Sequence, residues 1–229
     1  MRGALCLGLL ASGLQAGILN YDASVMPASL GITQVIFGDT TMTTSGGVLQ
    51  MTTYPFEGVW FGGTSGMAPW FLGNYMRVDT QLNAASDDWY IYFGDAHNLA
   101  LLRLGLNYLT YQDAAGLHTI TADLASSFRT IEIWMKNGIV TYAYDHQTIF
   151  SGAAVPYGGD PWLIGDPSGT DAGTSGTMFV DQVNIVNGVD FDSSAPAIPP
   201  SSPEPSTMLL GGTALGYLVY RRRAAQHRA

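Results

Sequence analysis

The chain has 229 residues, enough for one mid-sized domain with short end segments. Its only cysteine is Cys6, so disulfides, cysteine metal sites and cysteine nucleophiles are excluded from residues 17–192. These residues carry four basic and 17 acidic side chains, and the resulting charge of −13 would repel a phosphate backbone, so we expect no nucleic-acid partner.

The first 16 residues have the pattern of a secretory signal peptide. Arg2 supplies a positive charge, an apolar run extends from Ala4 to Leu14, and Ala16 is small, as a cleavage site requires. We therefore expect a signal helix over residues 1–16 that signal peptidase removes. A buried first helix is the alternative, although the run lacks a polar face.

Residues 17–192 predict one β-sandwich domain with almost no helix. Short β-branched and aromatic runs are separated by Gly, Asp, Asn and Ser, and no repeat has a fixed period, which argues against propellers and solenoids. Many short antiparallel strands are typical of a sandwich or barrel. The expected strands are residues 18–22, 33–37, 48–53, 58–61, 75–82, 89–94, 99–104, 107–112, 118–121, 129–136, 139–144, 148–150, 162–164 and 177–186.

The sharpest local signal is Asn137-Gly138, which lies between two alternating runs. Both residues accept a positive φ, so the pair favours a type I′ turn that joins residues 129–136 to 139–144. Residues 145–147 then predict a second turn, which places His146 at its tip.

This hairpin and the late segment 176–185 resemble concanavalin A-like and laminin-G-like domains over roughly residues 75–187. The resemblance implies an all-β, antiparallel jelly-roll β-sandwich of the kind that binds sugars or proteins, and it does not imply an enzyme. The similar hydrolases carry a Glu-x-Asp-x-x-Glu strand. Counted from Glu132, the matching positions hold Trp134 and Asn137, so that set is incomplete and we expect no catalysis.

Aromatic residues are the stronger candidates for contacting a ligand. In residues 129–136, parity sets Trp134 opposite Ile131 and Ile133 and beside Glu132, on the outer side of its strand. An outward tryptophan can stack on a sugar. Trp89 shares a face with Ile91, and Tyr90 and Tyr92 share the other, so one of these two faces must fill the core. The candidate ligand-binding residues are Trp134, Glu132 and Trp89.

Metal and cofactor signals are sparse. No histidine pair has zinc spacing and no HExxH occurs, so we expect no cofactor. The glycine-rich segment 165–176 contains Asp166 and Asp171 among many backbone carbonyls, which are hard oxygen ligands suited to Ca²⁺. The alternative for this segment is an ordinary surface loop.

The C-terminal segment has the pattern of a membrane anchor. A Pro/Ser linker spans residues 193–203, and an uncharged apolar run at about 207–220 predicts a single transmembrane helix. Basic residues follow it directly, which predicts that they stay in the cytoplasm while the body lies outside. Pro203, Glu204 and Pro205 precede the apolar run, and Arg221, Arg222 and Arg223 follow it.

The order of these parts over residues 203–229 resembles the PEP-CTERM sorting signal, which implies that these three residues before the run and three arginines after it are the sorting motif. That resemblance implies processing by exosortase, a membrane protease-transpeptidase, in a Gram-negative bacterium that makes exopolysaccharide. A plain single-span anchor is the alternative.

Together these features predict an exported cell-surface or matrix protein whose body is a non-catalytic glycan-binding or scaffolding module. The expected partners are an exosortase-type processing enzyme, signal peptidase and extracellular polysaccharide. Two alternatives stay open: a purely structural matrix protein without a ligand, and a weak glycoside hydrolase or lyase.

Overall fold

The computed structural model describes residues 18–64, 73–83, 88–159, 161–167 and 175–187. The segments expected to be the signal peptide, linker and sorting tail lie outside these residues. No helix in the part of the chain that the structure describes has both the length and the hydrophobicity needed to span a bilayer.

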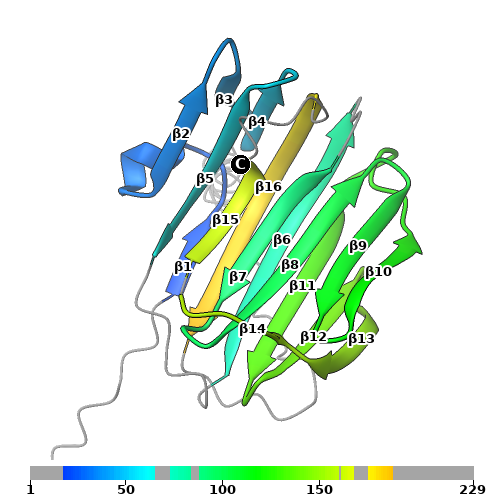
Figure 1. Cartoon of the computed structure of the whole chain (residues 1–229). Helices are drawn as coiled ribbons and strands as arrows, with labels where there is room; N and C mark the ends of the chain where they lie inside the picture. The colour runs from blue at the N-terminus through cyan, green and yellow to red at the C-terminus, as the bar shows by residue number, and fades with distance from the viewer. Residues whose placement is uncertain (1–17, 65–72, 84–87, 160, 168–174, 188–229) are drawn as a thin grey trace, which may run out of the picture. The chain divides into compact units, whose positions relative to one another are not determined.

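Two antiparallel sheets stack face to face (Figure 1). Sheet A is made of β1 (Ile18–Tyr21), β3 (Thr41–Ser45), β4 (Val48–Thr53), β6 (Asn74–Asn83), β11 (Arg129–Lys136), β12 (Ile139–Tyr144), β13 (Gln147–Ala153) and β16 (Gly176–Asn187). Sheet B is made of β2 (Thr33–Phe37), β5 (Gly58–Thr64), β7 (Trp89–Gly94), β8 (Asn98–Gly105), β9 (Tyr108–Asp113), β10 (Gly116–Thr121), β14 (Val155–Pro156) and β15 (Pro161–Asp166). A 3-10 helix, η1 (Pro27–Leu30), precedes β2.

The strand order in sheet A is β13-β12-β11-β6-β16-β4-β3, and β1 also pairs with β16. In sheet B the order is β10-β9-β8-β7-β15-β5-β2, and β14 pairs with β8. Hairpins form one end of each sheet, β11-β12-β13 in sheet A and β7-β8-β9-β10 in sheet B, whereas central neighbours such as β6 and β16 are far apart in the chain. The predicted all-β sandwich is therefore confirmed, with β11 and β7 at interior positions of their sheets.

The predicted strands and turns agree closely with the structure. Asn137 and Gly138 have φ angles of 53° and 75°, which confirms the expected turn between β11 and β12. Asp145 and His146 also have positive φ angles, 48° and 65°, in the turn that joins β12 to β13. These two residues lack the conformational freedom of glycine, so side-chain contacts must hold this turn.

Strand β3 was not predicted. Its sequence, Thr41–Ser45, has a single large apolar side chain, Met42, and so lacks a visible alternating pattern. The signal that could have found it is Gly46-Gly47, whose positive φ angles close the hairpin to β4.

The core fills the space between the sheets. In β11 the buried aliphatic residues are Ile131, Ile133 and Met135, and β6 contributes Met76, Val78 and Leu82, as the alternation predicts. Tyr142 of β12 crosses the layer and donates from its hydroxyl to the carbonyl oxygen of Gln112 in β9, at 2.9 Å. This bond satisfies a buried hydroxyl and ties the two sheets together.

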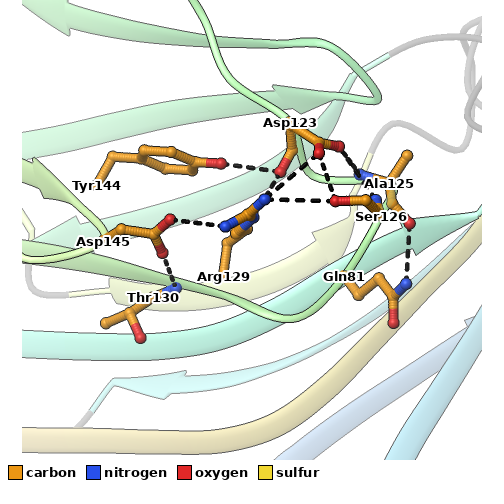
Figure 2. A network of polar contacts seen from close by, with 8 residues as sticks. All are labelled: Gln81, Asp123, Ala125, Ser126, Arg129, Thr130, Tyr144 and Asp145. Atoms are coloured by element: carbon orange, nitrogen blue, oxygen red, sulfur yellow. Dashed lines mark hydrogen bonds and ion pairs between the residues drawn. The ribbon is translucent and has the colours of Figure 1, made fainter.

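A polar network fastens the connection between β10 and β11 to sheet A (Figure 2). The carboxyl group of Asp123 accepts hydrogen bonds from the backbone amides of Ala125 and Ser126 and from the hydroxyl group of Ser126. Tyr144 donates to the carbonyl oxygen of Asp123 at 2.8 Å, and Gln81 donates to that of Ala125 at 2.9 Å. The connection is thereby held by β6 and β12.

Arg129 extends this network to the β12–β13 turn. Its guanidinium group donates to the carbonyl oxygen of Asp123 at 2.9 Å and to the carboxyl group of Asp145 at 3.1 Å. The other carboxyl oxygen of Asp145 accepts from the backbone amide of Thr130 at 3.1 Å. These bonds supply the contacts that hold Asp145 at its positive φ angle.

The network predicts a specific acid sensitivity. Hydrogen bonds from Ser126 lower the pKa of Asp123 from 3.8 to about 2 in the folded protein. The unfolded chain therefore takes up this proton first, and stability should fall as the pH drops from about 4 to about 2. We expect Asp123→Asn to flatten the pH dependence of the free energy of unfolding in this window, as measured by urea unfolding. Ser126→Ala should raise the pKa of Asp123, as followed by NMR titration, and an unchanged pH dependence in Asp123→Asn would contradict the assignment.

Candidate functional site

Two of the three predicted ligand residues lie together on the outer face of sheet A. Trp134 and Glu132 point away from the core, because the alternate residues of β11 fill it. Trp134 is in register with Tyr75 of β6 and Thr141 of β12, and Glu132 is in register with Arg77. We call this surface the Trp134 face and define it by Tyr75, Arg77, Glu132, Trp134, Thr141, His146 and Ser151.

Glu132 is a buried residue of this surface that holds its neighbours by hydrogen bonds. Only 3% of it is accessible to solvent. Its Oε1 accepts a hydrogen bond from the hydroxyl group of Tyr75 at 2.8 Å, and its Oε2 lies 3.1 Å from Nδ1 of His146. Burial raises the pKa of the Tyr75 hydroxyl above its usual range, and the neighbouring Glu132 adds to this shift. Tyr75 therefore stays a hydrogen-bond donor.

Trp134 forms an aromatic wall on this surface. Its ring lies 5.3 Å from that of Tyr75, centroid to centroid, at a tilt of 37°, and its side chain is partly exposed. On its other side the cross-strand neighbours are small: Thr141 and then Ser151, whose hydroxyl oxygens are 2.8 Å apart on the exposed surface. Trp134 therefore lies beside two short side chains that end in hydroxyl groups.

The charged groups around this wall are paired with one another. Arg77 binds both carboxyl oxygens of Asp79, at 3.1 and 2.8 Å, and Thr130 donates to Asp79 at 2.7 Å. Burial acts to lower the pKa of Arg77, but the hydrogen bonds and charge of Asp79 outweigh it and raise that pKa. Asp79 and Glu132 are both buried, and both carboxyl groups have polar partners: Arg77 and Thr130 for Asp79, and Tyr75 and His146 for Glu132. This arrangement favours a supporting role for the two carboxyl groups over acid–base chemistry.

The third predicted ligand residue, Trp89, is misassigned. It is 0% exposed and packs in the core with Ile91 and Phe93 of the same strand, so it has no surface to offer a ligand. The alternation itself is correct, because Tyr90 and Tyr92 lie on the opposite face of β7. The choice of inner face was the error.

The outer face of sheet B carries an aromatic surface that the candidate residues did not include. Tyr90 and Tyr92 stack with their rings 5.8 Å apart at 13°, and the guanidinium carbon of Arg103 lies 5.8 Å from the centre of the Tyr90 ring. Trp60 of β5 also points outward and is partly exposed. We define these four residues as the tyrosine face. Alternation in residues 89–94 was the signal that could have found it.

The predicted calcium ligands are only partly within the described residues. Asp166 is fully buried at the end of β15, where its Oδ2 accepts a hydrogen bond from the hydroxyl group of Thr53 at 3.0 Å. This bond links the two sheets. Asp171 lies outside the described residues, and within the described ranges no three His, Cys, Asp or Glu side chains are grouped to hold a metal. The calcium site stays a prediction.

No protein-family model matches the sequence, and no curated protein matches it either. Solved structures share its fold. A Crh5 transglycosylase in complex with NAG superposes with a TM-score of 0.56 at 13% identity, over 74% of this chain and 84% of that one. A Bacillus licheniformis β-glucanase superposes with a TM-score of 0.51 at 10% sequence identity, over 75% of this chain and 98% of the β-glucanase. The potassium-bound carbohydrate recognition domain of Emp46p superposes with a TM-score of 0.51 at 10% sequence identity, over 74% of this chain and 96% of that domain. At these identities the likeness shows the fold alone, a jelly-roll sandwich.

Proposed function

We propose that residues 18–187 form a non-catalytic carbohydrate-binding module and that the Trp134 face is its binding surface. One observation carries the proposal: the partly exposed Trp134 ring stands beside exposed hydroxyl groups on a rigid sheet. An aromatic ring offers an apolar surface to the C–H face of a sugar, and nearby hydroxyl and imidazole groups supply hydrogen bonds. The same fold in a β-glucanase and a carbohydrate recognition domain supports the proposal without deciding it.

The local charges favour an uncharged glycan. Arg77 is neutralised by Asp79, and Glu132 is buried against Tyr75 and His146. The body as a whole is acidic, since 17 acidic and four basic side chains lie in residues 17–192. An acidic polysaccharide would meet repulsion from this surface without a free basic cluster to offset it.

The supporting contacts beneath Trp134 favour binding by a preformed surface. Tyr75 donates a hydrogen bond to Glu132 and packs against the Trp134 ring, so little side-chain motion is lost when a sugar stacks. The same burial keeps Glu132 and Asp79 from the solvent-exposed surface. For this reason we propose binding and not hydrolysis.

The test is binding of the purified protein to laminarin, barley β-glucan, xyloglucan and galactomannan, by affinity electrophoresis and calorimetry. We expect at least one to bind, and Trp134→Ala to weaken binding at least about tenfold because it removes the stacking surface. Tyr54→Ala is the matched control, since Tyr54 is an exposed aromatic outside the Trp134 face. The proposal would be overturned if the wild type bound none of the four polysaccharides. It would also be overturned if the protein released reducing ends from any of them.

We also propose that the chain is exported and sorted through its C-terminal segment. The support is the order of parts in the sequence: Pro203-Glu204-Pro205, the apolar run 207–220, and Arg221–Arg223. Replacing the three arginines with glutamine should leave the tail uncut, because the positive charges no longer hold it in place for the processing enzyme. Mass spectrometry of the mature protein measures this, with Arg228→Gln as control. An unchanged mature mass in the triple variant would count against the assignment.

A further inference from the structure

We infer that the protein carries a second carbohydrate-binding surface, the tyrosine face, and that it cross-links glycan chains through its two outer faces. This inference rests on the proposed function above. It adds a second site of the same ligand class on the other sheet, together with an activity that a single-site module lacks.

The first observation is the fixed geometry of the tyrosine pair. Tyr90 and Tyr92 alternate outward from β7 and stack in parallel at 5.8 Å, while Arg103 of the adjacent β8 covers Tyr90. Asp88 restrains Arg103 at 3.7 Å and accepts a hydrogen bond from the hydroxyl group of Tyr108 at 2.7 Å. The rings are therefore held before any ligand arrives, which lowers the entropy lost on binding.

The second observation is a third aromatic side chain on the same outer face. Gly165 of β15 is in register with Trp60 on one side and with Tyr90 on the other. Gly165 is buried, and a Cβ atom there would lie 2.8 Å from the Cβ of Trp60, so β5 and β15 approach each other closely at this point. Trp60 therefore lies on the same face as the tyrosine pair, with β15 between them.

The third observation is the position of the two surfaces in the sandwich. The Trp134 face lies on the outer side of sheet A and the tyrosine face on the outer side of sheet B, because the alternate residues of β11 and β7 fill the core. The two sheets stack on each other (Figure 1). Stacked sheets are about 10 Å apart, and the two surfaces point in opposite directions. One glycan strand cannot lie on both faces at once, but two strands can be bridged by one protein.

The chemistry of the tyrosine face also fits an uncharged chain. Its single cationic group, Arg103, lies against the Tyr90 ring and near Asp88, so the charge of Arg103 is offset and the surface is mainly aromatic. Bridging then depends on the length of the glycan, because a long chain binds many protein molecules and links them into a network.

The experiment adds protein to whichever of laminarin, barley β-glucan, xyloglucan and galactomannan binds best, and follows clustering by light scattering. The wild type should cluster the polysaccharide at intermediate ratios and release it at large protein excess. Trp134→Ala should keep only the weaker site on the tyrosine face, and the double variant Tyr90→Ala/Tyr92→Ala should keep only the site on the Trp134 face. Each variant then has one site per protein and should not cluster the polysaccharide. Tyr54→Ala should behave as the wild type, and the protein alone should not scatter.

Calorimetry with a hexasaccharide of the same glycan gives a readout that needs no variant, and two sites per protein are expected. One site per protein, or clustering that persists in both single-face variants, would overturn the inference and leave the proposed function standing. A wild type that binds none of the four polysaccharides would instead overturn the proposed function, and the inference would fall with it.

Discussion

Replacing Trp89 with alanine is expected to lower the free energy of unfolding by about 3–5 kcal/mol, the range for removing a large aromatic side chain from a packed core. Trp89 is fully buried, and its strand contributes Ile91 and Phe93 to the same core. The space it leaves cannot be filled by neighbours that are themselves held in two paired sheets. Urea unfolding of the purified variant measures the loss.

The matched control for Trp89→Ala is Trp134→Ala. Trp134 is partly exposed on the outer face, so its removal should cost no more than about 1 kcal/mol of stability while it weakens glycan binding. A folded Trp89→Ala protein should bind glycan as the wild type does. The reverse pattern, with Trp89 affecting binding and Trp134 affecting stability, would mean that the inner and outer faces of the two strands are wrongly assigned.

Replacing Gly165 with alanine is expected to lower the free energy of unfolding by about 3–5 kcal/mol, through backbone strain and overpacking together. Gly165 has a φ angle of 134°, which side-chain-bearing residues rarely adopt. A Cβ atom there would lie 2.4 Å from the carbonyl oxygen of Val59 and 2.6 Å from the Cα of Trp60. Both contacts are with the backbone of β5, so the sheet itself would have to shift.

Gly116 provides the control that separates these two causes. Its φ angle is 140°, but a Cβ atom there would meet nothing within 4 Å. Gly116→Ala should therefore show the strain alone, about 1–3 kcal/mol. The additional loss in Gly165→Ala measures how closely β15 approaches β5. Equal losses in the two variants, measured by urea unfolding, would show that this approach is unimportant.

Apart from β3 and the two-residue β14, the strand positions were predictable because side chains alternate between the two faces of a strand. In β11 the assignment of faces was also predictable. One side holds Ile131, Ile133 and Met135, and the other holds Glu132 and Trp134, so only the first can line a core. Asn137-Gly138 was predictable for a different local reason, since few residue pairs accept two positive φ angles.

Strand β7 shows where this reasoning ends. Trp89, Ile91 and Phe93 lie on one face, and Tyr90 and Tyr92 on the other, so both faces are large and apolar enough to be buried. The local sequence pattern therefore does not decide which of the two faces is buried. The structure places the first face in the core, and the second becomes the tyrosine face that residue patterns alone had left open.

The site itself depends on pairings that local sequence does not contain. Tyr75 and Glu132 are 57 residues apart and meet because β6 pairs with β11, and the Thr53–Asp166 bond spans 113 residues across the two sheets. The Glu132–His146 contact further requires the turn at Asp145, which Arg129 and Thr130 hold through their bonds to its carboxyl group.

Local periodicity and backbone preference, which act over a few residues, thus set most strand positions, the type I′ turn at Asn137-Gly138 and the outward direction of Trp134. The order of strands, the burial of Trp89, the support of Trp134 by Glu132 and Tyr75, and the alignment of Trp60 with Tyr90 across Gly165 were set only when distant strands paired. The physical reason is that burial and hydrogen bonding in a sandwich depend on strand neighbours, and the neighbours of the central strands β6, β16 and β15 are remote in the chain.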